Sequence, residues 1–253
     1  MPAAEKCHPR WLTYGNPITQ RATSLGGGAG EPHTNQQGGC MKILIACEYS
    51  GIVRDAFIQS GHNAISCDIL PTESPGPHYQ GDVRDLLSES WDMIIAHPPC
   101  TRLANSGVRW LHERDLWLDL DMACDFFRLF LNHDCPKIAI ENPIPHKYAI
   151  ERIGRKYDQV VQPWQFGHGE SKAICLWLKG LPKLKPTEVV SGRNQKVWKM
   201  PPGEDRAKER ARFYTGIAEA MADQWTKCIH EFSPTCRRLA EYECVNCETV
   251  RIL

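Results

Sequence analysis

A cysteine in a proline-rich turn is the residue of this chain best suited to covalent chemistry. Cys100 follows His97-Pro98-Pro99, directly after the apolar run Trp91–Ala96. Two prolines fix the backbone and end a strand abruptly, so they present the thiol in a rigid loop. Such a thiol acts as a nucleophile when its pKa is lowered or a base lies nearby. The alternative is a structural cysteine in a proline turn.

A carboxyl group and a carboxamide follow another apolar run. Glu141-Asn142-Pro143 comes directly after Lys137–Ile140. A partly desolvated carboxyl group holds its proton more readily and can donate that proton to a ring nitrogen. Because neighbouring strands end at the same edge of a parallel sheet, we expect Glu141 to lie near Cys100. The alternative role for Glu141 is to cap a helix.

A glycine turn and two acidic residues indicate a second site. Gly51 follows Lys42–Cys47, at a strand-to-helix turn where the helix N-terminus favours a carboxylate or phosphate. Asp68 follows the next strand, where an acidic residue commonly takes a pair of ribose hydroxyls. Asp82 comes after Gly81. An ordinary turn is the alternative for Gly51, and a surface loop acid is the alternative for Asp82.

Short apolar runs alternate with amphipathic stretches, which predicts the elements that position these residues. The expected strands are Lys42–Cys47, Asn63–Leu70, Trp91–Ala96, Lys137–Ile140, Gln159–Gln165 and Lys172–Leu178, and the expected helices are Gly51–Ser60, Glu113–Leu131 and Asp205–Trp225. This alternation predicts an α/β fold with a Rossmann-like, mostly parallel sheet covered on both faces. The short link Phe166–Ser171 predicts an antiparallel hairpin at one edge. Ligands bind beyond the carboxyl ends of such strands.

Length and composition limit the class of protein. The 253 residues allow one domain, or one domain with a small appendage. Lys+Arg and Asp+Glu are both 30, which excludes a globally basic protein that coats nucleic acid. Residues 1–150 carry 12 basic and 17 acidic residues, whereas residues 151–253 carry 18 and 13, so one half is acidic and the other basic. That asymmetry permits a local surface for nucleic acid.

The two ends of the chain differ from its middle. Residues 1–40 are rich in glycine, lack periodicity and are expected to be a flexible tail. They contain no apolar segment typical of a secreted protein, and the chain contains no run long enough for a transmembrane helix, so we expect a cytoplasmic protein without membrane association. Residues 227–253 hold four of the twelve cysteines.

These C-terminal cysteines predict a structural zinc site. Cys228, His230, Cys244 and Cys247 supply four ligands for tetrahedral zinc, with Cys236 as a rival for one of them. A tail this short has too little core to fold unaided, and a metal would stabilise it. Unstructured thiols are the alternative.

In order along the chain, these motifs resemble those of S-adenosylmethionine-dependent DNA (cytosine-5)-methyltransferases, especially the short members from phages and prophages. The resemblance covers about residues 41–225, and we expect a methyltransferase domain over residues 41–226. Its specific part is the combination of Pro98-Pro99-Cys100 with Glu141-Asn142, each after a strand.

The resemblance implies a role for each residue. Cys100 would add to carbon 6 of cytosine, Glu141 with Asn142 would engage ring N3 and the exocyclic amine, and Lys172 would supply a cation to the base or phosphate. The residues implied to bind S-adenosylmethionine are Tyr49, Ser50, Gly51, Asp68, Ile69, Asp82, Val83 and Pro98. The expected substrate is DNA, single-stranded or read with weak sequence specificity, and the expected state is a monomer.

The chain departs from the family pattern at several positions. Val53 replaces a second glycine, His97 stands where a small residue is common, and Glu170-Ser171-Lys172 replaces an arginine pattern. Only a short basic stretch, residues 179–212, stands in place of a large target-recognition domain. This stretch can hold phosphates, or it can be a solvated charged loop.

Three other functions remain open from the sequence. An amino-group methyltransferase fits less well, because it needs an Asp/Asn-Pro-Pro-aromatic loop. A methyltransferase acting on free cytosine nucleotides would suit the missing recognition domain. A non-catalytic nucleic-acid-binding module would use only the basic stretch and the C-terminal tail.

Overall fold

A seven-stranded sheet forms the centre of the protein. The computed structural model describes residues 40–195, 203, 206–227, 232–236, 241–244 and 250–252. The strands are β1 (Lys42–Ala46), β2 (Asn63–Asp68), β3 (His78–Gln80), β4 (Met93–Ala96), β5 (Lys137–Pro143), β6 (Gln159–Val161) and β7 (Ile174–Lys179). Their order is β3-β2-β1-β4-β5-β7-β6. All pairings from β3 to β5 are parallel, whereas β7 runs antiparallel to both β5 and β6. The predicted mostly parallel sheet with an antiparallel pair at one edge is therefore confirmed.

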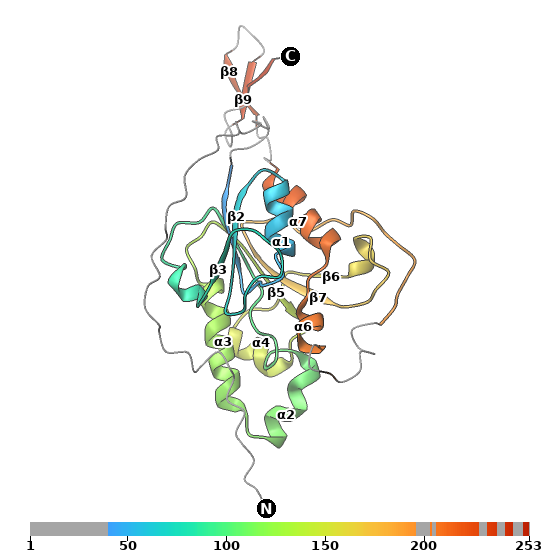
Figure 1. The fold of residues 1–253 in the computed structure, drawn as a ribbon. Coiled ribbons are helices and arrows are strands. Elements are labelled where there is room, and N and C mark those ends of the chain that lie inside the picture. Colours follow the sequence, from blue (N-terminus) through green and yellow to red (C-terminus); the bar gives the residue numbers. More distant parts are fainter. Residues whose placement is uncertain are drawn as a thin grey trace, which may run out of the picture. The chain divides into compact units, whose positions relative to one another are not determined.

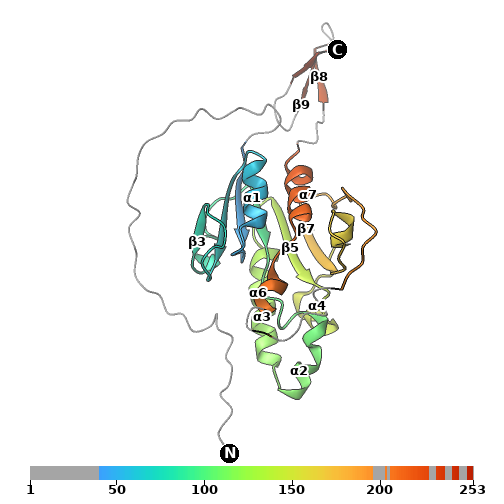
Figure 2. The ribbon, with the colours of Figure 1, turned by 45° about the vertical axis from the view of Figure 1, so that its right-hand side comes forward.

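Helices cover both faces of this sheet (Figures 1 and 2). The α-helices are α1 (Ile52–Gln59), α2 (Val108–Glu113), α3 (Trp117–Leu131), α4 (Lys147–Ile153), α6 (Arg206–Ala211) and α7 (Thr215–Thr226). Short 3-10 turns span Val83–Asp85, Asn105–Gly107 and Pro163–Gln165. Helices α1 and α7 lie side by side over one face, and α3 and α4 pack over the other.

The strand β1 shows why the central runs are continuously apolar. Ile43 and Ile45 pack into the core beneath α1 and α7, while Leu44 and Ala46 pack into the core beneath α3. All four side chains are fully buried. A strand covered on both faces has no polar face to present to water, so its sequence does not alternate.

Two of the predicted helices are interrupted. The helix expected over Glu113–Leu131 begins only at Trp117, because Asp115 adopts a positive φ of 49° that a helix cannot contain. Residues 108–113 instead form the separate helix α2. The helix expected over Asp205–Trp225 is divided into α6 and α7, with Tyr214 in an extended conformation as the N-cap of α7.

Some strands are shorter than predicted, and two elements were not predicted. The strand β2 ends at Asp68 instead of Leu70, and β6 ends at Val161 because Pro163 begins a 3-10 turn and has no N–H for a ladder. The strand β3 and the helix α4 were missed. No described helix is long and apolar enough to cross a membrane.

A second, three-stranded sheet lies near the C-terminus in sequence. It consists of β8 (Phe232–Cys236), β9 (Glu241–Cys244) and β10 (Val250–Ile252), paired antiparallel in the order β10-β9-β8.

Candidate active site

The loops after β4 and β5 bring Cys100 and Glu141 together. Ala96 pairs with Ile140 in parallel register, so His97 and Glu141 leave adjacent strands at the same level. Cys100 follows three residues later, and the negative charge of Glu141 acts on its thiol. The expected juxtaposition of Cys100 and Glu141 at the carboxyl edge is therefore present.

An unpredicted contact joins Glu141 to His97. The Nδ1 atom of His97 lies 3.2 Å from Oε2 of Glu141, and both side chains are nearly buried, at 11% and 13% exposure. No polar atom of the described residues lies within hydrogen-bonding distance of the buried Nε2 atom of His97. Glu141 therefore belongs to a strand and pairs with an imidazole, while His146 is the residue that caps helix α4.

The environment of Cys100 disfavours its thiolate. Burial raises the pKa of the Cys100 thiol, and the charge of Glu141 raises it further. Lys172 and Arg210 act in the opposite direction, but they do not reverse the shift. Of the two activating conditions that the sequence analysis named, a lowered thiol pKa is absent, so activation must come from a nearby base, from the pH, from a bound substrate or from a change in the charge of Glu141.

Asn142 fastens the two loops to each other. Its Nδ2 atom donates to the backbone oxygen of Pro98 at 3.1 Å, and its buried Oδ1 atom has no hydrogen-bond partner in the part of the chain described. Further on, Asn105 N donates to Ile144 O at 2.8 Å, and His146 N donates to Leu103 O at 3.1 Å. The loop that carries Cys100 is thus held against the segment after Glu141.

Lys172 is placed by the segment 210–216, which includes the end of α6 and the start of α7. Its Nζ atom donates to the backbone oxygen of Arg210 at 2.9 Å and lies 5.5 Å from the centre of the Tyr214 ring. The link 166–171 also contacts this segment, because Gly216 N donates to the His168 ring at 3.0 Å. A side chain at position 216 would overlap the Phe166 carbonyl oxygen, which requires glycine there.

The same segment also contacts the loop after β4 and the loop after β2. Phe213 lies in an edge-to-face arrangement against His97, with ring centres 4.9 Å apart. Arg210 acts electrostatically on Cys100, and Arg212 forms an ion pair with Glu73 at 2.6 Å in the loop after β2. The sequence analysis missed these three residues, because it placed them inside one continuous helix over Asp205–Trp225.

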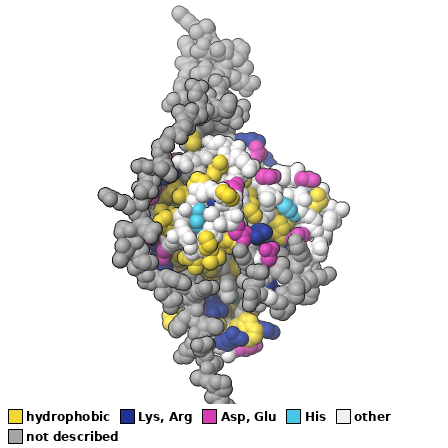
Figure 3. All heavy atoms as spheres, viewed as in Figure 1, with side chains coloured by type: hydrophobic (Ala, Val, Ile, Leu, Met, Phe, Trp, Pro, Cys, Tyr) yellow, Lys and Arg dark blue, Asp and Glu magenta, His cyan; other side chains and the backbone are white. Residues whose placement is uncertain are grey.

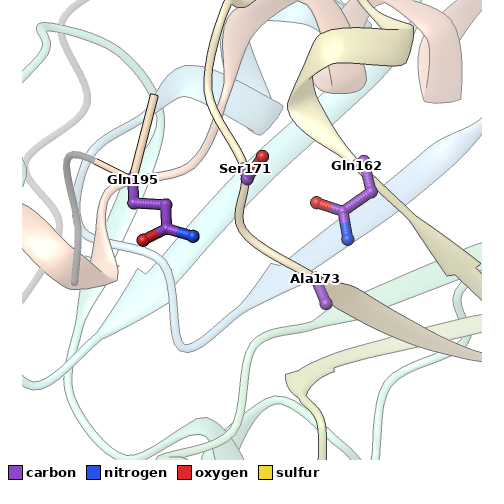
Figure 4. Close-up of a pocket in the computed structure, with 4 residues that line it drawn as sticks. All are labelled: Gln162, Ser171, Ala173 and Gln195. Carbon is purple, nitrogen blue, oxygen red and sulfur yellow. The ribbon is translucent and has the colours of Figure 1, made fainter. Parts of the chain in front are cut away.

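Figure 4 shows a pocket at the start of β7 and the link before it. It is lined by Gln162, Ser171, Ala173 and Gln195. The Gln162 Oε1 atom accepts from the backbone N–H of Lys172 at 3.0 Å. This hydrogen bond fixes Gln162, one of the lining residues, to the strand side of the hairpin. Cys100 and Glu141 do not line this pocket.

The predicted cofactor turn is held by a network of its own. Gly51 adopts a φ of 77°, as a tight turn requires. However, the N-terminus of α1 is already occupied, because the Glu48 carboxylate accepts from Val53 N at 2.7 Å and from Arg54 N at 3.3 Å. The expectation that these N–H groups await a ligand carboxylate or phosphate is wrong. Ser50 also turns inward, donating to Glu48 at 3.0 Å.

Arg54 ties this turn to the loop after β2. Its side chain is fully buried and donates to Ser66 Oγ at 3.2 Å, to Thr72 Oγ1 at 3.2 Å and to Ser74 O at 3.0 Å. It also pairs with Asp55 at 2.8 Å. The guanidinium group therefore fixes the loop that begins directly after Asp68.

The acidic residues predicted for the cofactor lie together. Asp68 and Asp82 both raise the pKa of the Cys47 thiol, after burial as the main cause, so both lie near the end of β1. Burial likewise raises the pKa of Asp68, although its Oδ1 atom accepts from Leu70 N at 2.9 Å. Ile69 is 46% exposed, whereas Val83, Tyr49 and Pro98 are buried.

Helix α2 carries a cationic and aromatic surface close in sequence to Cys100. The guanidinium groups of Arg109 and Arg114 each lie 4.2 Å from the centre of the Trp110 ring. Both arginines are exposed, and neither forms an ion pair with any carboxylate of the described residues. Figure 3 shows Lys and Arg side chains around a hydrophobic side chain in the region of α2, at the bottom of the view.

Part of the predicted basic stretch and most of the predicted zinc site lie outside the described residues. Lys179 donates to His133 O at 2.7 Å, and Arg193 lies 3.8 Å from the Trp164 ring centre. Cys228, His230 and Cys247 lie outside the described residues, and for Cys244 only the backbone within β9 is described. No metal-binding cluster occurs among the described residues, and the zinc site stays a prediction.

Comparisons with known proteins identify structural resemblance without a family. No family model matches the chain, and no curated protein sequence matches it. One similar solved structure is a protein assigned as a DNA modification methyltransferase encoded within an E. coli prophage, at 14% identity and a TM-score of 0.39, covering 63% of this chain. Another is the Entamoeba histolytica methyltransferase EhMeth, at 15% identity and a TM-score of 0.38, covering 60% of this chain.

The chain spans 55% and 58% of the lengths of these two proteins. With TM-scores below 0.5, neither likeness defines the family or the activity of this chain.

Proposed function

We propose that this protein transfers a methyl group from S-adenosylmethionine to carbon 5 of cytosine in DNA. The observation that carries the proposal is the position of Cys100 and Glu141 at the ends of two adjacent parallel strands, where a thiol and a carboxyl group act on one another. A nucleophile beside a proton donor is the pair that an addition to a pyrimidine ring requires.

In the proposed reaction, the Cys100 thiolate adds to carbon 6 of the cytosine while Glu141 gives a proton to ring N3. This proton is needed because carbon 6 is a poor electrophile in the neutral ring. The added electron density makes carbon 5 nucleophilic, so carbon 5 takes the methyl group. Loss of the proton from carbon 5 and departure of the thiolate, with return of the N3 proton, restore the ring and the enzyme.

The side chains at the ends of β1, β2 and β3 suit the adenosine part of the cofactor. The half-buried Asp68 carboxylate can accept from ribose hydroxyls, the exposed Ile69 can pack on the adenine, and Asp82 with Val83 borders the same space. When bound, S-adenosylmethionine would supply an activated methyl group. Because Glu48 and Arg54 occupy the turn at Gly51, the cofactor would contact that turn from outside the network.

The DNA partner is supported by helix α2. Arg109 and Arg114 are exposed cations without ion pairs among the described residues, and their guanidinium groups lie against the Trp110 ring, so their charge is available to phosphates. The helix follows the Cys100 loop after a single 3-10 turn. The helix that would bind a substrate phosphate is therefore separated from the reacting cysteine by only a few residues of sequence. This surface is a better candidate for the DNA contact than the basic stretch 179–195 alone.

The function is tested by incubating the protein with labelled S-adenosylmethionine and either duplex or single-stranded DNA. The DNA is then digested to nucleosides. We expect the label in 5-methyldeoxycytidine. Label in N4-methyldeoxycytidine or N6-methyldeoxyadenosine would instead support the amino-group alternative, and label transferred only to free cytosine nucleotides would replace DNA as the substrate. No transfer under any condition would contradict the proposal.

A further inference from the structure

The histidine before the two prolines belongs to the candidate site, although the proposed reaction gives it no role. His97 contacts Glu141 at 3.2 Å through Nδ1, and its side chain is only 11% exposed. On the other side it meets the ring of Phe213. A protonated imidazole in this position would be stabilised by a carboxylate on one side and an aromatic ring on the other.

We propose that His97 and Glu141 hold one proton between them, and that His97 is a positioning residue that acts on Cys100 through the charge of Glu141. This inference rests on the proposed function for its use in catalysis, but the proton sharing itself does not. Two titratable groups in direct contact and shielded from solvent take up protons as a pair.

The charged and titratable groups around the pair come from several elements. Glu141 belongs to β5, Cys100 to the same loop as His97, and Cys175 of β7 has its pKa raised by burial first and by Glu141 second. Lys172 of the hairpin and Arg210 of α6 both act on Cys100. The two cations lower the pKa of the Cys100 thiol, whereas a bare Glu141 carboxylate raises it, so a proton on the pair removes that opposing charge.

The shared proton would serve both requirements of the proposed reaction. While the pair keeps its proton, Glu141 does not oppose formation of the Cys100 thiolate. When the thiolate adds to the ring, Glu141 passes the proton to N3, and the pair regains it when the ring releases it. The histidine at this position, where the resembled family commonly has a small residue, would thus allow a buried thiol to react near neutral pH.

The reactivity of Cys100 tests this inference without any methyl transfer. The rate of alkylation by iodoacetamide is measured from pH 5.5 to 9.5 by mass spectrometry of the Cys100 peptide. The proteins compared are the full-length wild type, His97→Gln, Glu141→Gln and the double variant. His62→Gln is the matched control. His62 is a half-buried histidine directly before β2, at the amino ends of the parallel strands, whereas His97 lies at their carboxyl ends. Circular dichroism checks folding, and His97→Asn is measured in parallel as a smaller replacement.

We expect His97→Gln to slow alkylation at pH 7 by roughly three- to tenfold and to move the profile to higher pH, because Glu141 then lacks the shared proton and its charge opposes the thiolate. Glu141→Gln should leave the rate at pH 7 near that of the wild type, because the protonated pair carries no opposing charge there, and the double variant should match Glu141→Gln, since His97 acts through the carboxylate. His62→Gln should leave the rate unchanged.

A His97→Gln profile that overlays the wild type would overturn the inference, as would an equal slowing in the Glu141→Gln background. The result is independent of the proposed function. Absence of DNA methylation together with the expected alkylation pattern would reject the reaction and keep the pair.

Discussion

Two polar regions meet at the carboxyl edge of the sheet, and they are built in opposite ways. At the end of β1, Glu48 and Arg54 are buried and make several hydrogen bonds each. In the loop after β4 and at the end of β5, His97 Nε2 and Asn142 Oδ1 are buried and have no hydrogen-bond partner among the described residues. Buried polar atoms are normally paired. We therefore expect the first region to have a structural role, whereas the second region has polar atoms that can form hydrogen bonds to a ligand.

This difference predicts which substitutions should affect activity and which should affect stability. Removing a group from a satisfied network leaves its partners unpaired, which costs folding free energy. Removing a group that has spare hydrogen-bonding capacity costs less folding free energy and more function. The following predictions test whether the two regions separate in this way.

The largest expected effect is on catalysis. Glu141→Gln should reduce methyl transfer by about 10²–10⁴-fold, because the amide cannot supply the proton that Glu141 gives to the ring. Its free energy of unfolding should change little. Glu48→Gln is the matched control, since it makes the same replacement in the structural region. It should lower the free energy of unfolding by about 1 kcal/mol while transfer stays measurable. Turnover of Glu141→Gln near that of the wild type would remove Glu141 from the chemistry.

The next effect is on stability. Arg54→Leu should lower the free energy of unfolding by about 3 kcal/mol, because several polar groups around the guanidinium lose their partner in a buried site. Arg54→Lys should have a smaller effect, since it keeps the charge but not the planar donors. Urea unfolding followed by circular dichroism measures both. A loss of less than about 1 kcal/mol in Arg54→Leu would mean that the network is dispensable.

The pH dependence of the reaction should follow the Cys100 thiol. Burial and Glu141 raise its pKa, so the reactive thiolate is scarce at neutral pH and becomes commoner as the pH rises. The single-turnover rate at saturating cofactor should therefore increase by about tenfold per pH unit below the thiol pKa, until the His97–Glu141 pair loses the proton that ring N3 needs. A rate that rises nowhere between pH 6 and pH 9 in protein that stays folded would contradict the assignment of Cys100 as nucleophile.

The smallest effect is expected at the DNA surface. Arg109→Ala and Arg114→Ala should each reduce the slope of log affinity against log salt by about 0.9, because each removes one phosphate contact. Arg193→Ala is the comparison from the basic stretch and should change the slope less. Fluorescence anisotropy with a short duplex and a single strand measures all three. Equal loss from all three variants would extend the surface to the basic stretch.

Much of the fold was predictable because burial on both faces leaves a strong sequence pattern. The runs Lys42–Cys47 and Lys137–Ile140 became central strands, and the short glycine-bearing link became a hairpin. The strand β3 was missed because His78–Gln80 is three residues long and at the edge of the sheet, and therefore carries no apolar run.

The candidate site was predictable only where a strand end marks it. Cys100 and Glu141 follow strands, so their proximity could be expected. Phe213 lies in the break between α6 and α7, and Arg210 lies in the last turn of α6; no local pattern says that this part of the chain reaches the β4 loop. The roles of Glu48 and Arg54 also depend on contacts that the sequence does not reveal. The turn at Gly51 resembles a ligand site in sequence, but in the structure the Glu48 carboxylate binds the N–H groups at the start of α1.

The central claim, that Cys100 attacks cytosine, is tested most directly by covalent trapping. DNA containing 5-fluorocytosine cannot lose a proton from carbon 5 after methyl transfer, so the attacking residue stays attached to the ring. With S-adenosylmethionine present, we predict a denaturation-resistant adduct of the wild-type protein that mass spectrometry locates at Cys100. The variant Cys100→Ala should form no adduct while it binds the cofactor within about tenfold of the wild type, or roughly 1.4 kcal/mol. An adduct in Cys100→Ala, or a wild-type adduct at another residue, would contradict the account.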